Sequence, residues 1–212
     1  MGGLGLGLSL SNSSESFTDS VGSSTYTIAN GDDDGYTESN STSSSSVQFN
    51  GSLLKSVTRV QVGAEDDDGA IKYNVGYFRF NNIAIDQGAT VQSATFKLIR
   101  RGINSGANKN FEIAGRDVDN AGVPSSASEL GTRTTARVTL LKSTIVNTAN
   151  NSIIDIPDIK TIIQELVDRA GWSSGNSIVL VVYTPSQFTN NALFAKFGSL
   201  ESNQPAQLVI TL

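Results

Sequence analysis

Hydrophobic and polar residues alternate in short runs along this chain, and segments rich in Ser, Asn, Asp and Gly separate the runs. The clearest run covers residues 91–99, in which Phe96 and Leu98 fall on the opposite side of an extended backbone from Lys97. A period of two residues is typical of a β-strand with one buried face. The pattern predicts an all-β domain of about nine strands. Ten candidate segments supply these strands: 25–28, 47–49, 56–62, 73–80, 91–99, 111–114, 136–140, 177–183, 193–197 and 206–212.

One segment has a different period and predicts the only α-helix, at about residues 157–170. Its apolar residues recur every three or four positions, which gives a helix one hydrophobic face; they are Ile159, Ile162, Ile163, Leu166 and Val167. Pro157 suits the first helical position, and Gly171 is placed to end the helix. We expect Trp172, the single tryptophan, to pack over the end of this helix rather than to bind a sugar.

Composition and charge exclude several classes of function. The chain has a net charge of −5 and no basic run beyond Arg100-Arg101, so phosphate neutralisation and nucleic-acid binding are excluded. The absence of histidine and cysteine removes the Ser-His-Asp triad and the usual zinc ligands, which favours a non-enzymatic protein. No apolar run is long enough to insert in a membrane. The first residues also lack the features of a secretory signal, so we expect either a mature fragment or a protein that reaches its destination without secretion.

The sequence of the first 22 residues indicates an extended arm that precedes a domain at residues 23–212. Glycines alternate there with leucines, which places the leucines on one side of an extended backbone; they are Leu4, Leu6, Leu8 and Leu10. One interpretation is a docking strand that binds a partner chain by strand addition, with the leucines as the partner-binding residues. The other is a tail without structure of its own, because glycine weakens a strand.

The order of several motifs resembles the DNRLRE-type domains, jelly-roll β-sandwiches that are related to carbohydrate-binding modules. The motifs are Asp32–Tyr36, Val75–Phe80 with Ile85–Phe96, Thr132–Val138, Ile162–Val167 with Gly171–Asn176, and Pro205–Ile210. Leu140 stands where that family usually has a tryptophan. The resemblance implies a jelly-roll β-sandwich over roughly residues 25–212, but it implies little about function because such domains occur on many different proteins.

The arm, the uncharged Ser/Thr/Asn surface and the missing signal together favour a bacteriophage virion protein. Such a protein would be a head-decoration (cement) or fibre subunit, assembled in the host cytoplasm and bound to other capsid or tail proteins, and we expect a homo-oligomer. The alternative is a glycan-binding module of a fibre or cell-surface protein, whose partner would be a host surface glycan.

Two acidic segments are candidate cation sites, although solvated turns are the alternative interpretation. Each ends in a glycine, and together they contain Asp32, Asp33, Asp34, Glu65, Asp66, Asp67 and Asp68. Carboxylates crowded in a loop repel one another unless a cation separates them, and Ca²⁺ takes about six to eight hard oxygen ligands. The spacing of an EF-hand is absent.

Aromatic and basic residues of the predicted strands are the remaining candidates. Tyr36, Tyr73 and Tyr77 are candidates for a platform on which a sugar ring would stack, but strands are rich in aromatic residues for reasons of packing. Arg79 lies between two phenylalanines, which favours an internal ion pair with an acidic residue; a strand residue that faces solvent is the alternative.

Overall fold

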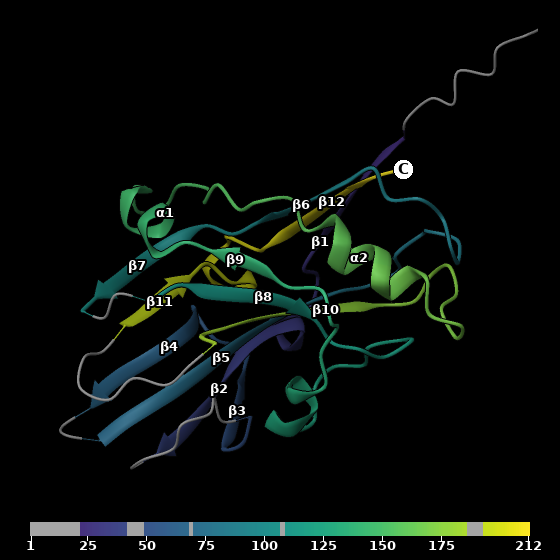
Figure 1. The fold of residues 1–212 in the computed structure, drawn as a ribbon. Helices are drawn as coiled ribbons and strands as arrows, with labels where there is room; N and C mark the ends of the chain where they lie inside the picture. Colours follow the sequence, from purple (N-terminus) through teal and green to yellow (C-terminus); the bar gives the residue numbers. More distant parts are fainter. Residues whose placement is uncertain (1–21, 42–48, 68–69, 107–108, 186–192) are drawn as a thin grey trace, which may run out of the picture.

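The computed structural model of the chain describes residues 22–41, 49–67, 70–106, 109–185 and 193–212. These residues form a mainly β structure with two antiparallel sheets, of three and nine strands, and two short helices (Figure 1). The three-stranded sheet has the order β1 (Ser23–Thr27), β12 (Gln207–Thr211), β6 (Ser93–Lys97). The larger sheet runs β7 (Arg100–Ser105), β11 (Leu193–Phe197), β4 (Val60–Asp67), β5 (Ala70–Phe80), β10 (Ile178–Tyr183), β8 (Phe111–Gly115), β9 (Val138–Leu140), with β2 (Asp34–Ser41) on β5 and β3 (Ser52–Lys55) on β2. The antiparallel, mainly β prediction is confirmed.

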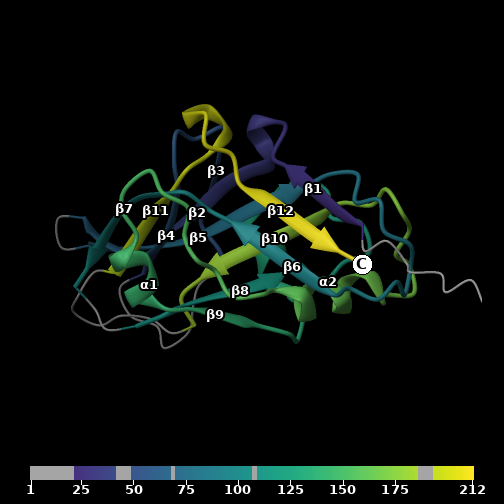
Figure 2. The ribbon, with the colours of Figure 1, turned by 90° about the horizontal axis from the view of Figure 1, so that it is seen from above.

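The three-stranded sheet lies over the larger one, and the main hydrophobic core fills the space between them (Figure 2). The ring of Phe96 from β6 makes edge contacts with Phe78 and Phe80 of β5, at centroid distances of 5.4 and 6.1 Å. All three side chains are fully buried. The alternation around residue 96 therefore identified the inner face of β6 correctly.

The larger sheet curls into a half-barrel because β4 leaves β5 part-way along its length. The β4–β5 ladder ends at Gly63 opposite Asn74, and from Gly76 onwards β5 pairs instead with β10. Gly63 has a φ of +111°, and a Cβ there would lie 2.1 Å from the carbonyl oxygen of Leu193. Glycine is thus required at this bend, from which β4 continues across the core beside β11.

Strand β10 is buried on both faces and lies between β5 and β8 in the larger sheet. Its outward-facing residues, Val179 and Val181, pack in a second hydrophobic cluster with Tyr77 and Leu130. Leu130 belongs to the 3₁₀ helix η2 (Ala127–Gly131), so the segment after β8 covers this face. A strand buried on both faces reads as a continuous apolar run, as residues 178–183 do.

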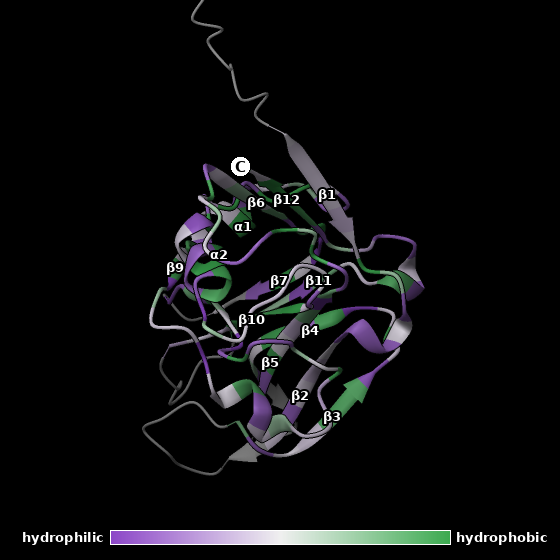
Figure 3. Ribbon diagram, turned by 90° about the vertical axis from the view of Figure 1, so that its right-hand side faces the viewer, coloured by the Kyte–Doolittle hydropathy of each residue, from purple (hydrophilic) through white to green (hydrophobic). Residues whose placement is uncertain are grey.

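Helix α2 (Lys160–Val167) is shorter than the predicted helix at 157–170. Before it, the carboxylate of Asp158 accepts the backbone N–H of Ala94 at 3.0 Å and that of Lys160 at 2.8 Å. These bonds hold the preceding residues against β6, so the helix begins later than its hydrophobic period indicated. Figure 3 shows hydrophobic and hydrophilic residues on different sides of α2. Trp172 is buried and donates its indole N–H to the carbonyl of Ile85 at 2.9 Å, which confirms its packing role.

Several elements were not predicted. A second helix, α1 (Lys142–Asn147), follows β9, so the prediction of a single helix is wrong for this part of the chain. The alternation did not mark strands β2 and β7, which are polar, or strand β3, in which two leucines are adjacent rather than alternating. The described strands therefore number twelve rather than about nine. Strand β4 extends through most of the acidic segment predicted as a loop. The strand predicted at 47–49 is not found at Phe49, and its first two residues lie outside the described residues.

Candidate functional site

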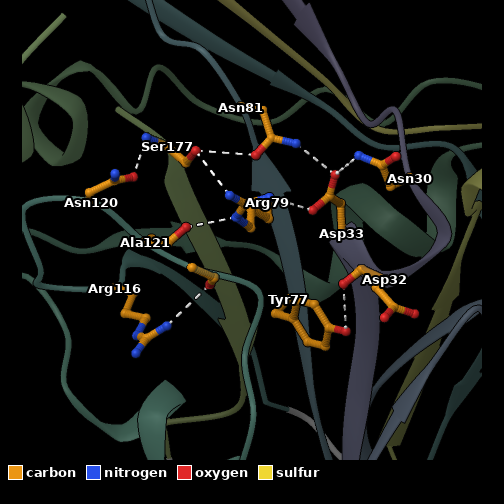
Figure 4. A network of polar contacts seen from close by, with 11 residues as sticks. Asn30, Asp32, Asp33, Tyr77, Arg79, Asn81, Arg116, Asn120, Ala121 and Ser177 are labelled. Atoms are coloured by element: carbon orange, nitrogen blue, oxygen red, sulfur yellow. Dashed lines mark hydrogen bonds and ion pairs between the residues drawn. The ribbon is translucent and has the colours of Figure 1, made fainter. Parts of the chain in front are cut away.

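The first acidic segment lies in η1 (Gly31–Asp33) and at the start of β2, and its carboxylates serve separate contacts rather than one ion (Figure 4). The side chain of Asp33 is completely buried and forms an ion pair with Arg79, with an N–O distance of 2.7 Å. Asn30 and Asn81 also donate to it, at 3.0 and 2.7 Å. The predicted internal ion pair of Arg79 is therefore confirmed.

Arg79 joins three parts of the chain through its guanidinium group. Besides Asp33, it binds the carbonyl of Ala121 at 2.7 Å and the hydroxyl of Ser177 at 3.1 Å (Figure 4). Its five N–H donors in one plane suit this arrangement of acceptors. The network fixes η1, the segment after β8 and the start of β10 relative to one another, and its role is structural.

The other two carboxylates of the first segment point to different partners. Asp32 accepts a hydrogen bond from the hydroxyl of Ser56 at 3.1 Å, and Asp34 accepts the backbone N–H of Leu200 at 2.9 Å. Burial, together with the negative charges of Glu201 and Asp33, raises the pKa of Asp34 from 3.8 to about 7, although the bond from Leu200 acts in the opposite direction. Within the described ranges, no group of three acidic side chains could hold a metal ion.

The second acidic segment continues strand β4 into its hairpin with β5. Glu65 lies opposite Lys72 in this ladder, and Asp66 and Asp67 occupy the next two strand positions. Asp68 lies outside the described residues, as do the arm residues Leu4, Leu6, Leu8 and Leu10. The described carboxylates that we predicted to bind calcium in this segment thus lie at the end of a strand, whereas we expected a closed loop.

The tyrosines predicted as a ligand platform are buried. The exposed fractions of Tyr36, Tyr73 and Tyr77 are 9%, 4% and 0%. The hydroxyl of Tyr77 donates to the carbonyl of Asp32 at 3.2 Å, and burial raises its pKa. Rings in the interior cannot stack on a sugar at the surface, so these three residues provide no platform; their burial agrees with the packing interpretation.

Sequence reasoning missed a polar cluster around Tyr183, at the end of β10. The hydroxyl of Tyr183 donates to Glu112 at 2.6 Å and accepts from Arg137 at 3.0 Å. The guanidinium of Arg133 lies 4.5 Å from the centre of the Tyr183 ring and 3.9 Å from that of Phe49. Burial raises the pKa of Tyr183 and lowers that of Arg133. These contacts hold the segment after η2 against the sheet.

A basic groove lies on the outward side of β4, β11 and β7. We define it by its lining residues, which are Thr58, Arg59, Arg101, Lys196 and Ser202, and its volume is about 330 Å³. The residues come from the segment before β4, from β7, from β11 and from the 3₁₀ helix η3 (Leu200–Ser202). Along β11 the buried residues alternate with the partly exposed Phe194 and Lys196, so Lys196 projects from the face opposite the core.

A second hollow, of about 250 Å³, lies beside the residues of η3. It is lined by Lys97, Ile99, Ile153, Asn203, Gln204, Pro205 and Gln207. Arg101 of the basic groove donates to the side-chain oxygen of Gln204 at 2.8 Å, which links the residues of the two hollows. Ile153 is 59% exposed, the highest value among the exposed large hydrophobic residues of the described part of the chain.

No known protein family matches this chain. No curated protein sequence matches it either. The resemblance to DNRLRE-type domains therefore rests on the quoted motifs alone and stays a prediction. None of the helices in the described residues has the length and apolar character needed to cross a membrane.

Proposed function

We propose that this chain is a non-enzymatic structural protein of a bacteriophage virion, a head-decoration (cement) or fibre subunit held by its N-terminal arm. The observation that carries the proposal is where the arm joins the domain. Residues 1–22 lead directly into β1, which lies at the edge of its sheet and pairs with β12 alone among the described strands. An arm that leaves from an edge strand can add to a partner sheet without opening the core.

The finer architecture belongs to the same proposal. We take the two sheets to be the layers of a jelly-roll β-sandwich, which the packing of Phe96 on Phe78 and Phe80 supports. The acidic and basic residues of the Arg79 network are occupied by contacts that fix the fold. This use of polar residues suits a rigid module that is displayed on a particle, in complex with capsid or tail proteins and with other copies of itself.

The test is attachment to particles that lack the protein, measured by co-sedimentation. Serine replacements of the four arm leucines keep the length and the glycines of the arm, and we expect them to abolish co-sedimentation; they are Leu4→Ser, Leu6→Ser, Leu8→Ser and Leu10→Ser. Removal of residues 1–12 should act in the same way. Circular dichroism and thermal melting should remain those of the full chain, because the core of the described residues is formed by side chains that follow the arm.

The matched control changes serines in the same arm to alanine, at Ser9, Ser11, Ser13 and Ser14. This control should still attach, since the docking strand is expected to bury leucines. If the truncated protein co-sediments as well as the full chain, attachment through the arm is refuted. Mass spectrometry of purified particles checks the virion location independently.

The second candidate function is a glycan-binding module of a fibre or surface protein. The observation that favours it is a pair of neighbouring hollows, the basic groove on the outward side of the larger sheet and the hollow beside η3 at the end of the three-stranded sheet. Hydroxyl, amide and basic side chains contribute to their lining. Side chains of these types bind sugars through hydrogen bonds to their hydroxyl groups. A glycan array that gives no binding above background would count against this second function.

A further inference from the structure

The basic groove carries positive charge that the fold does not neutralise. None of the ion pairs among the described residues involves Arg59, Arg101 or Lys196. Arg101 binds only the neutral amide of Gln204, and the ammonium group of Lys196 lies over the ring of Phe194, 4.7 Å from its centre. In a chain with a net charge of −5, this cluster marks a place suited to an anion.

The side chains of the groove have the chemistry of a carboxylate site. An arginine presents parallel N–H donors that match the two oxygens of a carboxylate, and lysine adds a compact charge. Thr58 and Ser202 add hydroxyl groups that both donate and accept hydrogen bonds. A site with charged donors beside neutral hydroxyl groups suits a ligand that carries both a carboxylate and hydroxyl groups.

The position of the groove favours a sugar over a peptide or a nucleic acid as its anionic ligand. The groove lies over the face of β11, which pairs with β4 on one side and β7 on the other, so a peptide cannot bind by adding a strand to β11. A nucleic acid needs an extended basic track, whereas this cluster is local in an acidic protein. The volume of about 330 Å³ is at the lower end of small-ligand pockets.

We propose that the basic groove binds the carboxylate of an acidic sugar, with Arg59, Arg101 and Lys196 as its ligands. The hollow beside η3 receives the neighbouring sugar unit, because it offers the amides of Asn203 and Gln204 and the exposed apolar side chain of Ile153. This inference rests on the second candidate function and is independent of attachment through the arm.

The experiment compares ligands that differ in charge alone. Trigalacturonate and its methyl ester, and 3′-sialyllactose and its methyl ester, are titrated into the full-length protein and followed by NMR chemical shifts. We expect at least one carboxylated ligand to bind and its neutral counterpart to bind at least about tenfold more weakly, as the loss of charged hydrogen bonds implies. Added salt should weaken the binding, since the groove is open to solvent.

Variants of the groove test the residues directly. Arg101→Gln and Lys196→Gln should each weaken binding of the carboxylated ligand by about tenfold or more, with shifts confined to residues around the two hollows. The matched control is Lys160→Gln, which removes the same charge from an exposed position at the start of α2 and should leave binding unchanged.

Three outcomes would overturn the inference. The first is equal binding of the charged and neutral ligands, which leaves glycan binding in place but excludes a carboxylate site. The second is unchanged affinity in both groove variants, which places the site elsewhere. The third is no binding of either carboxylated ligand, in which case the arm-truncation experiment still decides the virion function separately.

Discussion

A buried carboxylate at Asp34 should make the folded protein less stable at neutral pH than at mildly acidic pH. The side chain has an exposed fraction of 0% and lies at the junction of η1 and β2. One oxygen accepts the N–H of Leu200, and the other has no hydrogen-bond partner among the described residues. The perturbation is Asp34→Asn, which keeps an oxygen for Leu200 and removes the charge.

The pKa of Asp34 is higher in the folded protein than in the unfolded chain, and this difference decides how stability changes with pH. Burial raises the pKa of Asp34 to about 7 in the folded protein, from 3.8 when it is unperturbed. Below the lower value the carboxyl group is protonated in both states, and its contribution to stability is fully present. As the pH rises towards 7, the unfolded chain releases the proton more readily than the folded one, so stability is lost through this range.

The pKa shift of Asp34 also sets the size of the change in the free energy of unfolding. Each pKa unit corresponds to about 1.4 kcal/mol, so the whole shift amounts to about 4 kcal/mol. Water and local relaxation screen part of the penalty of a buried charge, and we expect about 2 kcal/mol. Asp34→Asn should therefore raise the free energy of unfolding by about 2 kcal/mol at pH above 7, and by close to zero at pH near 4.

The assay is urea unfolding of both proteins at several pH values between these limits, with NMR titration of the Asp34 carboxyl carbon as a second measurement. The control, Asp155→Asn, makes the same chemical change at an exposed position and should leave the free energy of unfolding nearly unchanged. If the difference in the free energy of unfolding between Asp34→Asn and the parent protein stays constant across the pH range, the raised pKa of Asp34 does not destabilise the protein at neutral pH.

Two further predictions concern the fold. Arg79→Met should lower the free energy of unfolding by about 3 kcal/mol because it leaves the buried carboxylate of Asp33 without its cation, and adding Asp33→Asn should restore part of the loss in urea unfolding. Gly63→Ala should cost about 2 kcal/mol or more in the same assay, since its Cβ would lie 2.1 Å from the carbonyl of Leu193. Gly88→Ala, at a φ of +71° with nothing within 4 Å, should cost less; an equal loss would contradict the steric argument.

The sequence predicted strands well where one face is apolar and poorly where a strand is polar. The alternation does not mark strand β2, because its residues are Asp, Gly, Thr, Glu, Ser and Asn around a single tyrosine. Strand β2 is held by its pairing with β5 and β3. Gly35 allows the close approach of β3, because a Cβ at this position would lie 2.2 Å from the carbonyl oxygen of Leu54. Such close approaches depend on strand neighbours that are distant in sequence, and no local pattern encodes them.

Contacts between segments that are distant in sequence also decide which parts of the candidate site the sequence could predict. The internal partner of Arg79 could be anticipated, because an arginine between core residues requires an acceptor. The basic groove could not, since Arg59, Arg101 and Lys196 belong to separate segments that meet only because β11 pairs with both β4 and β7. The tyrosines failed as a platform because both faces of the sheet are covered: Tyr36 and Tyr73 lie in the main core, and Tyr77 lies in the second hydrophobic cluster.

Polar residues that the fold uses can be distinguished from those that it does not use by their effect on stability. Arg79 is held by three acceptors, so its loss should destabilise the protein. Arg101 and Lys196 line the same groove, and neither forms an ion pair with a carboxylate of the described residues. Like charges repel, so Arg101→Gln and Lys196→Gln should leave the free energy of unfolding within about 0.5 kcal/mol or raise it. Loss of ligand binding at unchanged stability would assign these residues to binding, whereas a loss of stability comparable to that of Arg79→Met would assign them to the fold.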